Sequence, residues 1–535
     1  MLKKIIVHNY RIFKDLTLEL DEEMNIIVGD NETGKSTILE AIGLALTKRI
    51  NGWYIENELS PYFFNVAAVQ EYFDKNSQGQ NVDLPNIFIE LYLNLSPEFS
   101  PLKGRNNSSK EDCCGIRLEI SFDDEYAQEY EEYLNARKDK EDQTKLIPTE
   151  YYKVIWRSFA GNALTARSIP IGLSSIDATN IRLQSGTDFY LRDFIRTNLD
   201  PKERVALSVA YRNLKESFIG EASIATINQG LDGSKGDITD KKLAIAIDVS
   251  QRTNWEANLI PHLDDLPFQM IGKGEQYSLK IMLALSKNAD DTNVLLIEEP
   301  ENHLSFSSMR RLLSRIEEKS NGKQIIITTH SSYVLNKLGL NKLILLSKEK
   351  QTNLQELPSD TQKYFKKLSG YDTLRLILAK KAILVEGPSD ELLVQRAYYN
   401  ESGKLPIDDG IDVINVRGLS FKRFLDIAVL LSLDVVVVTD NDGDYQRNIV
   451  DKYHDFLQND LIKICASSDD SLETLETQIV HCNDVGNLNS IFGTSLSTSE
   501  EMVNYMKNNK TVCALELFET KTDFEIPLYL QDAIQ

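Results

Sequence analysis

The chain has 535 residues, which is too long for one core and fits three or four domains of ~100–200 residues each. Apolar residues make up 42% and charged residues 26%, as in ordinary globular domains, so extensive disorder is not expected. A net charge of −22, from 59 basic and 81 acidic residues, excludes binding to nucleic acid or to an anionic membrane through bulk charge. The acidity is concentrated near the C-terminal end, because residues 381–535 contain 12 basic and 27 acidic residues.

The cysteines and the N-terminal residues indicate where the protein resides. The five cysteines form no Cys-x-x-Cys pair and no zinc-like spacing with histidine, as is typical of a reduced protein. The first residues lack the apolar core of a signal peptide, and no apolar run approaches the ~18 residues of a membrane span. We therefore expect a cytoplasmic protein with no membrane partner.

The first part of the chain has an α/β pattern. Apolar alternation and apolar runs predict strands at residues 4–7, 16–20, 24–28, 86–95 and 115–122. Helical spacing of apolar residues follows at 38–46, directly after a glycine-containing turn. A phosphate-binding loop requires this order of strand, glycine-rich turn and helix.

Long, charged, helix-forming segments occupy residues 189–242 and separate this strand and turn from the next α/β segment. We interpret residues 186–245 as a helical insertion that divides one domain into the parts 1–185 and 246–375. Its apolar spacing of three and four fits both a helical hairpin and a dimer face, and we assign it to dimerisation.

The α/β pattern resumes after the insertion. Strands are predicted at residues 294–297, 324–328 and 342–347, with a helix at 307–319. A polar stretch, residues 348–360, leads into the linker. A second α/β unit, assigned to residues 380–535, begins with an apolar strand and repeats strand and helix to about residue 458. Two such units in series predict two parallel-sheet domains.

Residues 29–36 fit the phosphate-loop pattern G-x-x-x-x-G-K-[ST]. Backbone N–H groups of such a loop surround phosphates, the lysine reaches the β- and γ-phosphates, and the hydroxyl ligates Mg²⁺. The strand before and the helix after make a chance match a poor explanation, so ATP or GTP binding is predicted. The expected nucleotide-binding residues are Asn31, Gly34, Lys35, Ser36 and Thr37.

The apolar strand at 294–297 ends in the paired acids Glu298 and Glu299. At such a strand end the first acid holds the water shell of Mg²⁺, and the second polarises the attacking water. The first acid is usually Asp. The side chain of Glu298 is one methylene longer, which we expect to affect the rate of nucleotide hydrolysis more than nucleotide binding. A further strand is followed by His330, in register with the paired acids, although a lone histidine is more often structural.

Acidic residues also follow the strands of the C-terminal unit. Because parallel strands end at the same edge of a sheet, these side chains should meet there. One strand-end acid is more often a solvent-facing cap, but their joint order favours a shared cation, Mg²⁺ or Mn²⁺. Two ions there would stabilise the attacking and leaving oxygens of a phosphodiester displacement. The expected metal ligands are Glu386, Asp390, Asp440, Asp442 and Glu476.

The first site resembles the ATPase head shared by ATP-binding-cassette, RecF-like and structural-maintenance-of-chromosomes proteins. The matching parts are residues 9–13, the phosphate loop, residues 272–276 as a signature loop, the paired acids, residues 300–304 and His330. The resemblance implies ATP as the nucleotide, with Gly274 in a signature loop that closes on the γ-phosphate held by another subunit. The resemblance therefore also implies a homodimer or a higher homo-oligomer that assembles through the heads. The signature departs from the common Ser-Gly-Gly-Gln at Gly272 and Lys273.

The second site resembles the Toprim domain, and the two domains in one chain resemble the overcoming-lysogenization-defect (OLD) family of ATP-dependent nucleases. This family includes the nuclease subunit of Gabija antiphage systems. The resemblance implies an ABC-type, RecF/SMC-like head interrupted by a helical insertion and followed by a Rossmann-like parallel-sheet Toprim domain. It assigns Glu386 and Asp390 to one metal and Asp440 and Asp442 to the other. It also prefers Glu476 to Glu473, aligns Gly418 with a family glycine, and places Lys510 on the scissile phosphate.

These observations support a metal-dependent DNA endonuclease or nickase controlled by nucleotide binding, in antiphage defence. The alternative is an ATPase scaffold or sensor whose Toprim part holds a partner effector. Strand passage or priming is disfavoured because no tyrosine stands in an interpretable context for strand passage, and RNA remains open as a substrate. A helicase or a reverse transcriptase with a noncoding RNA, encoded nearby, is a candidate partner. Phosphate contacts should come from basic patches on the head, the insertion or a partner, because the Toprim part is acidic.

Overall fold

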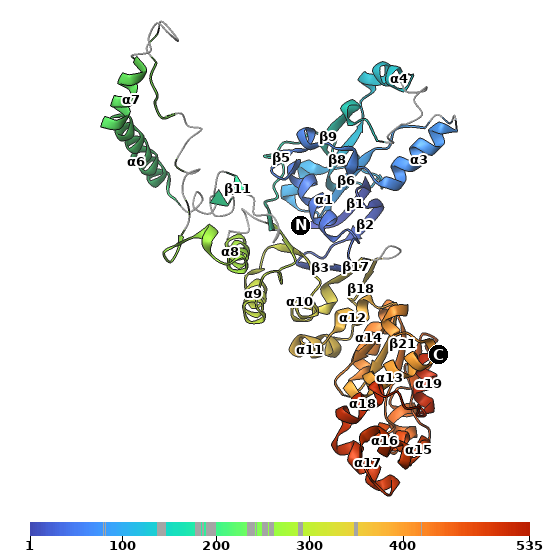
Figure 1. The fold of residues 1–535 in the computed structure, drawn as a ribbon. Coiled ribbons are helices and arrows are strands. Elements are labelled where there is room, and N and C mark those ends of the chain that lie inside the picture. The colour runs from blue at the N-terminus through green and yellow to red at the C-terminus, as the bar shows by residue number, and fades with distance from the viewer. Residues whose placement is uncertain are drawn as a thin grey trace.

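The computed structural model describes the chain except residues 79, 81, 136–145, 177–182, 185–186, 189–198, 233–240, 242, 249–254, 256–259, 261, 287–292, 347–350 and 419. Two six-stranded sheets build the N-terminal head, and a four-stranded parallel sheet builds the C-terminal domain (Figure 1). No helix in the described part of the chain is long and apolar enough to span a membrane.

The first sheet of the head is antiparallel, with the order β2-β1-β6-β8-β7 and β9 paired to β8. Its strands are β1 (Leu2–Tyr10), β2 (Phe13–Glu19), β6 (Ile87–Leu93), β7 (Lys103–Gly104), β8 (Cys113–Phe122) and β9 (Tyr152–Ser158). Alternate side chains of β1 and β8 are buried, as expected where one face of a sheet covers a core. That core is closed by α1 (Lys35–Thr47), whose Ala45 carbonyl accepts a hydrogen bond of 2.8 Å from the Trp156 indole.

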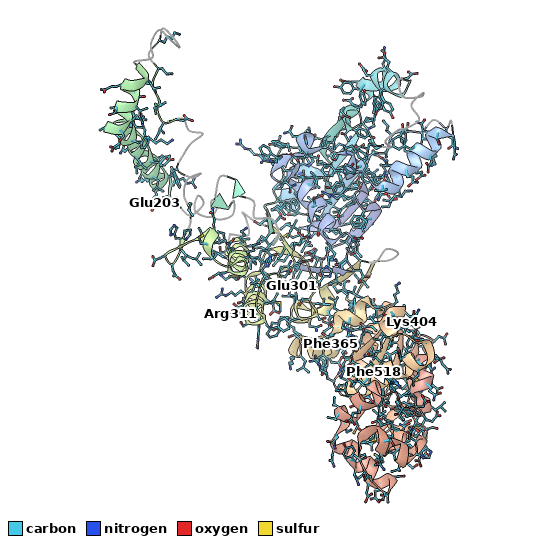
Figure 2. All side chains as sticks on the ribbon, in the orientation of Figure 1. Glu203, Glu301, Arg311, Phe365, Lys404 and Phe518 are labelled. Carbon is cyan, nitrogen blue, oxygen red and sulfur yellow. The ribbon has the colours of Figure 1, made fainter. Side chains whose placement is uncertain are left out.

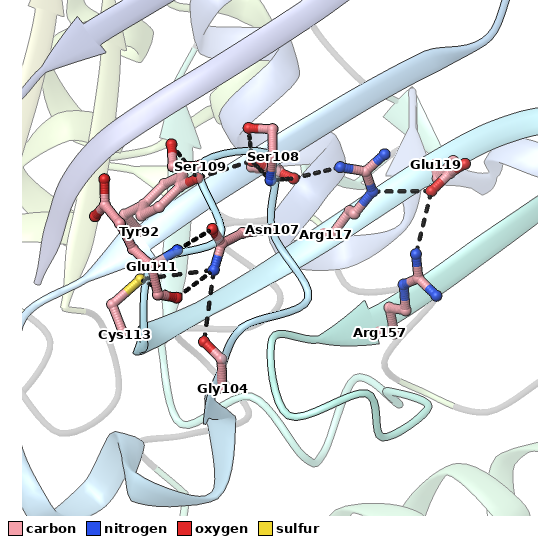
Figure 3. Close-up of polar contacts among 11 residues, drawn as sticks. Tyr92, Gly104, Asn107, Ser108, Ser109, Glu111, Cys113, Arg117, Glu119 and Arg157 are labelled. Carbon is pink, nitrogen blue, oxygen red and sulfur yellow. Dashed lines mark hydrogen bonds and ion pairs between the residues drawn. The ribbon is translucent and has the colours of Figure 1, made fainter.

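A polar network around a buried carboxylate links the middle strands of this sheet, and Figure 3 labels its members Ser108, Arg117 and Glu119. Glu90 on β6 is fully buried and forms an ion pair with Arg117, its register partner on β8. The backbone N–H of Ser108 donates to the same carboxylate at 2.8 Å, and Arg117 also pairs with Glu119. A buried charge is stable only when paired and hydrogen-bonded, so this network stabilises the sheet in one register.

The second sheet of the head has the order β10-β15-β16-β3-β17-β18 and is parallel except for β18. Its strands are β3 (Met24–Gly29), β10 (Leu173–Ile176), β15 (Val294–Glu298), β16 (Gln324–Thr328), β17 (Leu343–Leu346) and β18 (Gln351–Asn353). Helix α8 (Lys273–Ser286) precedes β15, α9 (Phe306–Lys319) follows β15, and α10 (Ser332–Leu338) follows β16. Strands buried on both faces carry almost uninterrupted apolar side chains, and β3 and β16 are buried at every position.

The structure confirms the predicted strands and helices of the head, with two corrections. Residues 272–276 were expected to form a loop, but α8 begins at Lys273, so most of the signature lies in the first helical turn. The polar stretch expected before the linker contains the antiparallel edge strand β18 at residues 351–353, for which the sequence predicted no strand. Residues 348–350 and the predicted domain boundary at 185–186 lie outside the described residues.

Two helices lie in the region expected to be an insertion, α6 (Pro201–Ile219) and α7 (Ala222–Asp232), and they project away from the sheets (Figure 1). Asp200 and Glu203 form a capping box that starts α6. The Trp255 indole donates to the Ser208 hydroxyl at 3.0 Å and packs on one side of this helix. Several apolar side chains of α6 stay exposed, among them Leu214 at 65% and Phe218 at 48%.

Smaller elements complete the head. They are β4 (Arg49–Ile50), β5 (Trp53–Tyr54), α2 (Ile55–Glu58), α3 (Val66–Ser77), α4 (Ala127–Asn135), β11 (Leu183–Gln184), β12 (Thr187–Asp188), β13 (His262–Leu263) and β14 (Leu266–Pro267).

The C-terminal domain is a parallel sheet of order β20-β19-β21-β22. Its strands are β19 (Lys381–Val385), β20 (Ile411–Asn415), β21 (Asp434–Val438) and β22 (Ile462–Cys465). The helices around it are α13 (Pro388–Ser402), α14 (Phe421–Leu431), α15 (Leu475–Cys482), α16 (Val485–Phe492), α17 (Ser499–Asn508), α18 (Lys510–Glu519) and α19 (Leu528–Ile534). Parallel strands of this kind need crossover helices, which here cover both faces.

Two short helices connect the head to the C-terminal domain: α11 (Ser359–Lys367) and α12 (Thr373–Leu378). Phe365 on α11, marked in Figure 2, is fully buried and meets the ring of Phe424 on α14 edge-on, with centroids 5.2 Å apart. One apolar core therefore runs from the second head sheet through α11 and α12 into the C-terminal domain. Packing across the junction is continuous, so the two domains are held together by more than a linker.

Candidate active sites

The phosphate loop lies between β3 and α1, at the edge where the parallel strands of the head end. Gly34 has a φ of +94°, and a Cβ there would lie 2.3 Å from the Phe13 ring, so only glycine fits. The Lys35 ammonium is buried over the loop and donates to the carbonyls of Gly29 at 2.9 Å and Asp30 at 2.8 Å. Burial lowers the pKa of Lys35, although the nearby acids Glu299, Asp30 and Glu298 oppose this shift.

The paired acids face the phosphate loop across the sheet. The Ser36 hydroxyl donates a hydrogen bond to the Glu298 carboxylate, and Tyr277 on α8 donates to the Glu298 backbone carbonyl. Glu298 reaches Ser36 because β15 pairs in parallel with β16, and β16 with β3, so the ends of these strands lie at the same edge of the sheet. The structure thus brings together the two side chains that the sequence predicted around a nucleotide-bound Mg²⁺.

Glu299 and His330 form the next part of the site. The Nε2 atom of His330 lies 3.4 Å from Oε1 of Glu299, and the amide of Asn302 donates to the other Glu299 oxygen at 2.6 Å. Glu299 has a φ of +45°, an unusual conformation for a residue with a side chain, and its N–H donates to the Thr328 carbonyl. Burial and the Lys35 ammonium lower the pKa of His330, which favours the neutral ring.

Glu301, marked in Figure 2, was not among the expected site residues, yet it connects the acid loop to the histidine segment. Its Oε1 atom accepts hydrogen bonds from the Thr329 hydroxyl at 2.7 Å and the His330 N–H at 2.8 Å. Its Oε2 atom is buried without a partner among the described residues, and burial raises the pKa of this carboxyl. Glu301 therefore positions the His330 backbone relative to the loop that carries Glu299.

The remaining expected nucleotide residues differ in their surroundings. Asn31 is exposed at the loop tip, and Thr37 is half-buried in the first turn of α1. A Cβ on Gly274 would lie 2.2 Å from the His303 carbonyl oxygen, so this glycine lets α8 pack against the loop after the paired acids. The start of α8 and the acid loop are therefore packed directly against each other.

The second candidate site lies at the edge of the C-terminal sheet, where β19 and β21 end side by side. Glu386 accepts a hydrogen bond from the Thr439 hydroxyl and another, of 3.3 Å, from the Asp440 N–H. Asp390 accepts from the Gly387 N–H at 3.1 Å in the first turn of α13. The parallel register Val385↔Val438 explains why acids far apart in sequence meet here.

Mutual repulsion marks this group of acids. Desolvation, followed by the neighbouring Glu386, raises the pKa of Asp390 to about 7. Desolvation together with Asp390 and Glu386 raises the pKa of Asp440 to about 8, and Glu476 contributes to both shifts. Carboxylates that raise one another's pKa values in this way need protons or cations between them. We call Glu386, Asp390, Asp440 and Glu476 the carboxylate cluster.

Glu476 and Glu473, the two alternatives of the sequence prediction, have different environments. Glu476 is 3% exposed, belongs to the carboxylate cluster, and lies 3.3 Å from the Lys510 ammonium. Glu473 is exposed and pairs with Lys507 at 3.0 Å. Asp442 is also exposed, with a φ of +49°, and is not among the groups that raise the pKa values of Asp390 and Asp440. The structure thus places Lys510 beside the cluster and Asp442 at its rim.

Sequence reasoning missed several groups around the carboxylate cluster. Asn441 is fully buried, and its amide donates to the carbonyls of Ser467 and Asp469, which fixes the acid loop to the segment after β22. The hydroxyls of Tyr453 and Tyr529 are buried without partners among the described residues. Burial raises both pKa values, with Glu386 adding to the shift of Tyr453 and Asp440 to that of Tyr529. Neither tyrosine stands in a motif, since packing of distant segments brings them here.

The donor set of the cluster fits a hard divalent cation. Two of its oxygens, Asp440 Oδ1 and Glu476 Oε2, are buried and lack any hydrogen-bond partner in the described structure. Within the described residues, however, no three His, Cys, Asp or Glu side chains converge as a finished ligand shell. Glu386 is turned toward Thr439 and Glu476 toward Lys510, so ion binding requires these side chains to turn.

The fold and the two sites define an ATPase head joined to a Toprim domain. Residues 1–335 match the family described as AAA ATPase domain, and residues 377–442 match the TOPRIM domain of overcoming lysogenization defect protein-like proteins. The chain therefore belongs to the OLD-like family that combines these two domains.

Two curated relatives align with most of the chain. The endonuclease GajA of Bacillus cereus strain VD045 is 24% identical over 464 residues, covering 82% of this chain and 74% of the relative. The OLD nuclease of Thermus scotoductus is 22% identical over 469 residues, covering 83% of this chain and 82% of the relative. Among solved structures, RecF with ATP aligns with 66% of this chain and 99% of its own, at 13% identity and a TM-score of 0.35.

Proposed function

We propose that this protein is a nucleotide-controlled, divalent-metal-dependent endonuclease or nickase that acts on DNA. The observation that carries the proposal is the carboxylate cluster, in which four acids from β19, α13, the end of β21 and α15 share one buried sheet edge. Burying mutually repelling acids costs stability, and metal-dependent phosphodiester cleavage is the chemistry that requires them. The relatives named as an endonuclease and an OLD nuclease support this assignment.

Each residue of the cluster has a proposed part in cleavage. Mg²⁺ or Mn²⁺, as two ions, would supply charge stabilisation at the attacking and leaving oxygens. Glu386 and Asp390 would bind one ion, and Asp440 would bind the other with Asp442 from the rim and Glu476 as a further acid. Lys510 would release Glu476 and contact the scissile phosphate, since its ammonium is half-exposed beside the cluster.

The head would control this reaction through ATP. Lys35 would exchange its two carbonyl partners for the β- and γ-phosphates, and Ser36 and Glu298 would hold one Mg²⁺. Glu299 would polarise the attacking water, with His330 beside it as the γ-phosphate sensor. Gly274 would close on the nucleotide of a second subunit in a homodimer or larger homo-oligomer.

We further propose a role in antiphage defence within the cytoplasm, because the OLD family that the chain resembles includes the nuclease subunit of Gabija antiphage systems. A helicase or a reverse transcriptase with its noncoding RNA would be the partner to test first, by co-purification. RNA cleavage is tested with the same metals as DNA cleavage, because metal-assisted phosphodiester chemistry does not itself select the sugar.

Incubation of the purified protein with supercoiled plasmid and Mg²⁺ or Mn²⁺ tests the proposed function. We expect nicked or linear product, and we expect Asp440→Ala to abolish it because the cluster loses a central ligand. Lys363→Ala, an exposed residue of α11 outside both sites, is the matched control and should cleave normally. If plasmid, single strands and RNA all stay intact with either metal, the scaffold or sensor function replaces this proposal.

A further inference from the structure

A basic groove lies at the junction of the head and the Toprim domain. It encloses about 810 Å³, and none of its lining residues is acidic. Side chains come from α9 and α10 of the head, from α11 and the segment after it, and from the loop that follows β20. We call this the junction groove, and its five basic lining residues are Arg310, Lys337, Lys366, Lys367 and Arg417.

The charges of the junction groove are only partly neutralised. Lys337 and Lys366 share one carboxylate, Glu317, at 3.2 and 2.8 Å. Arg310, Lys367 and Arg417 are exposed and form no ion pair with any carboxylate of the described residues. In a chain with a net charge of −22, such a concentration of positive charge attracts an anionic ligand locally.

Aromatic rings alternate with these cations. Phe306 is 60% exposed at the start of α9 and contacts Tyr333 edge-on, with centroids 4.6 Å apart. The Arg417 guanidinium lies over the ring of Tyr371, 5.7 Å from its centroid. Exposed rings and guanidinium planes stack on unpaired bases, whereas a ligand of phosphate alone has no use for them.

The junction groove adjoins both candidate sites. At its Toprim end, Gly418, the neighbour of Arg417, donates a hydrogen bond of 2.9 Å to the carbonyl of Glu386 in the carboxylate cluster. At its head end, α9 begins just after the loop that carries Glu299, and α10 begins two residues after His330. The groove therefore lies between the residues expected to sense the nucleotide and those expected to cleave.

We propose that the junction groove binds a single-stranded segment of nucleic acid and delivers its backbone to the carboxylate cluster. Arg310, Lys367 and Arg417 contact the phosphates, and the exposed ring of Phe306 stacks on an unpaired base. This inference rests on the proposed nuclease function and deepens it by naming the surface that holds the substrate. It also resolves the conflict between a strongly acidic chain and an anionic substrate, because contact is made through a groove lined by basic residues and no acidic ones.

Binding is measured without cleavage by placing all variants in an Asp440→Asn background. Fluorescence anisotropy with a labelled 20-mer oligo-dT and its duplex, in Mg²⁺ at several salt concentrations, compares two charge-reversed proteins. The test variant is Arg310→Glu/Lys367→Glu/Arg417→Glu. The control is Arg311→Glu/Lys363→Glu, which reverses exposed charges on the same helices outside the groove; Figure 2 marks Arg311.

We expect the test variant to bind oligo-dT at least tenfold more weakly than the control. The slope of the logarithm of the binding constant against the logarithm of the salt concentration should be shallower by about 2. Three phosphate contacts are lost, and each contact to a single strand contributes ~0.7 to this slope. Equal binding by both variants overturns the groove assignment, and plasmid cleavage by the otherwise unaltered chain then shows that the nuclease function stands. Weakened duplex binding with unchanged oligo-dT binding overturns the single-strand assignment. Failure of the unaltered chain to bind or cleave any nucleic acid overturns both proposals.

Discussion

The Ser36 hydroxyl donates a hydrogen bond to the Glu298 carboxylate, which joins the first turn of α1 to the end of β15. Lys35 beside it is held by two loop carbonyls. The groups expected to bind Mg²⁺ and phosphate are thus already in contact with one another. Binding of a nucleotide with its Mg²⁺ has to replace these contacts, and this exchange gives the head two distinguishable arrangements.

Lys35→Ala is expected to weaken ATP binding by about 10- to 100-fold, because a charge-assisted hydrogen bond contributes ~1.5–3 kcal/mol. The lysine is 7% exposed, so its removal also leaves the loop carbonyls of Gly29 and Asp30 without a donor. Titration calorimetry with ATP and Mg²⁺ measures the effect. Lys14→Ala, which removes an exposed lysine of β2, should leave affinity unchanged. Unaltered affinity in the Lys35 variant would contradict the assignment of the loop.

Glu299→Gln should lower ATP turnover by ~10²- to 10⁴-fold while leaving ATP affinity nearly intact, as expected for loss of a group that polarises water. The amide keeps the size of the side chain and can still contact Asn302 and His330. Phosphate release and ATP affinity, measured side by side, separate the two effects. Turnover that survives this substitution would move the catalytic role to another residue, with Glu298 the first alternative.

The sequence predicted the parts of both sites that depend on local order. A glycine turn between a strand and a helix, as at Gly34 and Lys35, is a local pattern with one physical use. Acids directly after apolar strands, as at Glu386 and Asp440, could be placed together because parallel strands end at a shared edge. The head sheets and the Toprim sheet followed from the same periodicities.

Groups brought in by tertiary packing could not be predicted. Tyr529 reaches the carboxylate cluster because α19 packs on β21 and β22, and nothing in its own segment signals this contact. Glu301 resembled an ordinary loop acid until the structure showed its bonds to Thr329 and the His330 N–H. The junction groove combines α9, α11 and Arg417, which are far apart in the chain, so only the fold reveals it.

The metal-free protein should lose stability as the pH rises from about 4 to about 8. Asp390 and Asp440 have folded-state pKa values raised to about 7 and about 8, above the value of 3.8 for a free Asp. The folded state therefore holds more protons than the unfolded state within this window, and its stability falls as those protons leave. Thermal unfolding in EDTA across this range measures the trend. Mg²⁺ should raise Tm more at pH 8 than at pH 6, and the reverse order would contradict the interpretation.

Asp440→Asn should stabilise the metal-free protein at pH 8.5 although it removes a proposed ligand. The neutral amide relieves repulsion from Asp390 and Glu386, and each 1 kcal/mol of relief raises Tm by ~2–4 °C for a domain of about this size. Calorimetry in EDTA measures this shift. Asp442→Asn removes an equal charge from the exposed rim and should change Tm little. A lower Tm for Asp440→Asn would mean that the cluster is not strained by its charges.

The exposed stripe of α6 should mediate self-association independently of nucleotide. Leu207, Leu214 and Phe218 share one face of this helix, because their spacings of seven and four match helical turns, and all three are exposed. Leu214→Asp/Phe218→Asp should weaken the oligomer more than about 100-fold, since each buried large apolar side chain contributes ~1.5–3 kcal/mol. Light scattering after gel filtration without nucleotide measures the mass. Val205→Asp, 63% exposed on the opposite face, is the control and should keep the mass of the unaltered chain. An unchanged mass in the double variant would assign any oligomer to the heads alone.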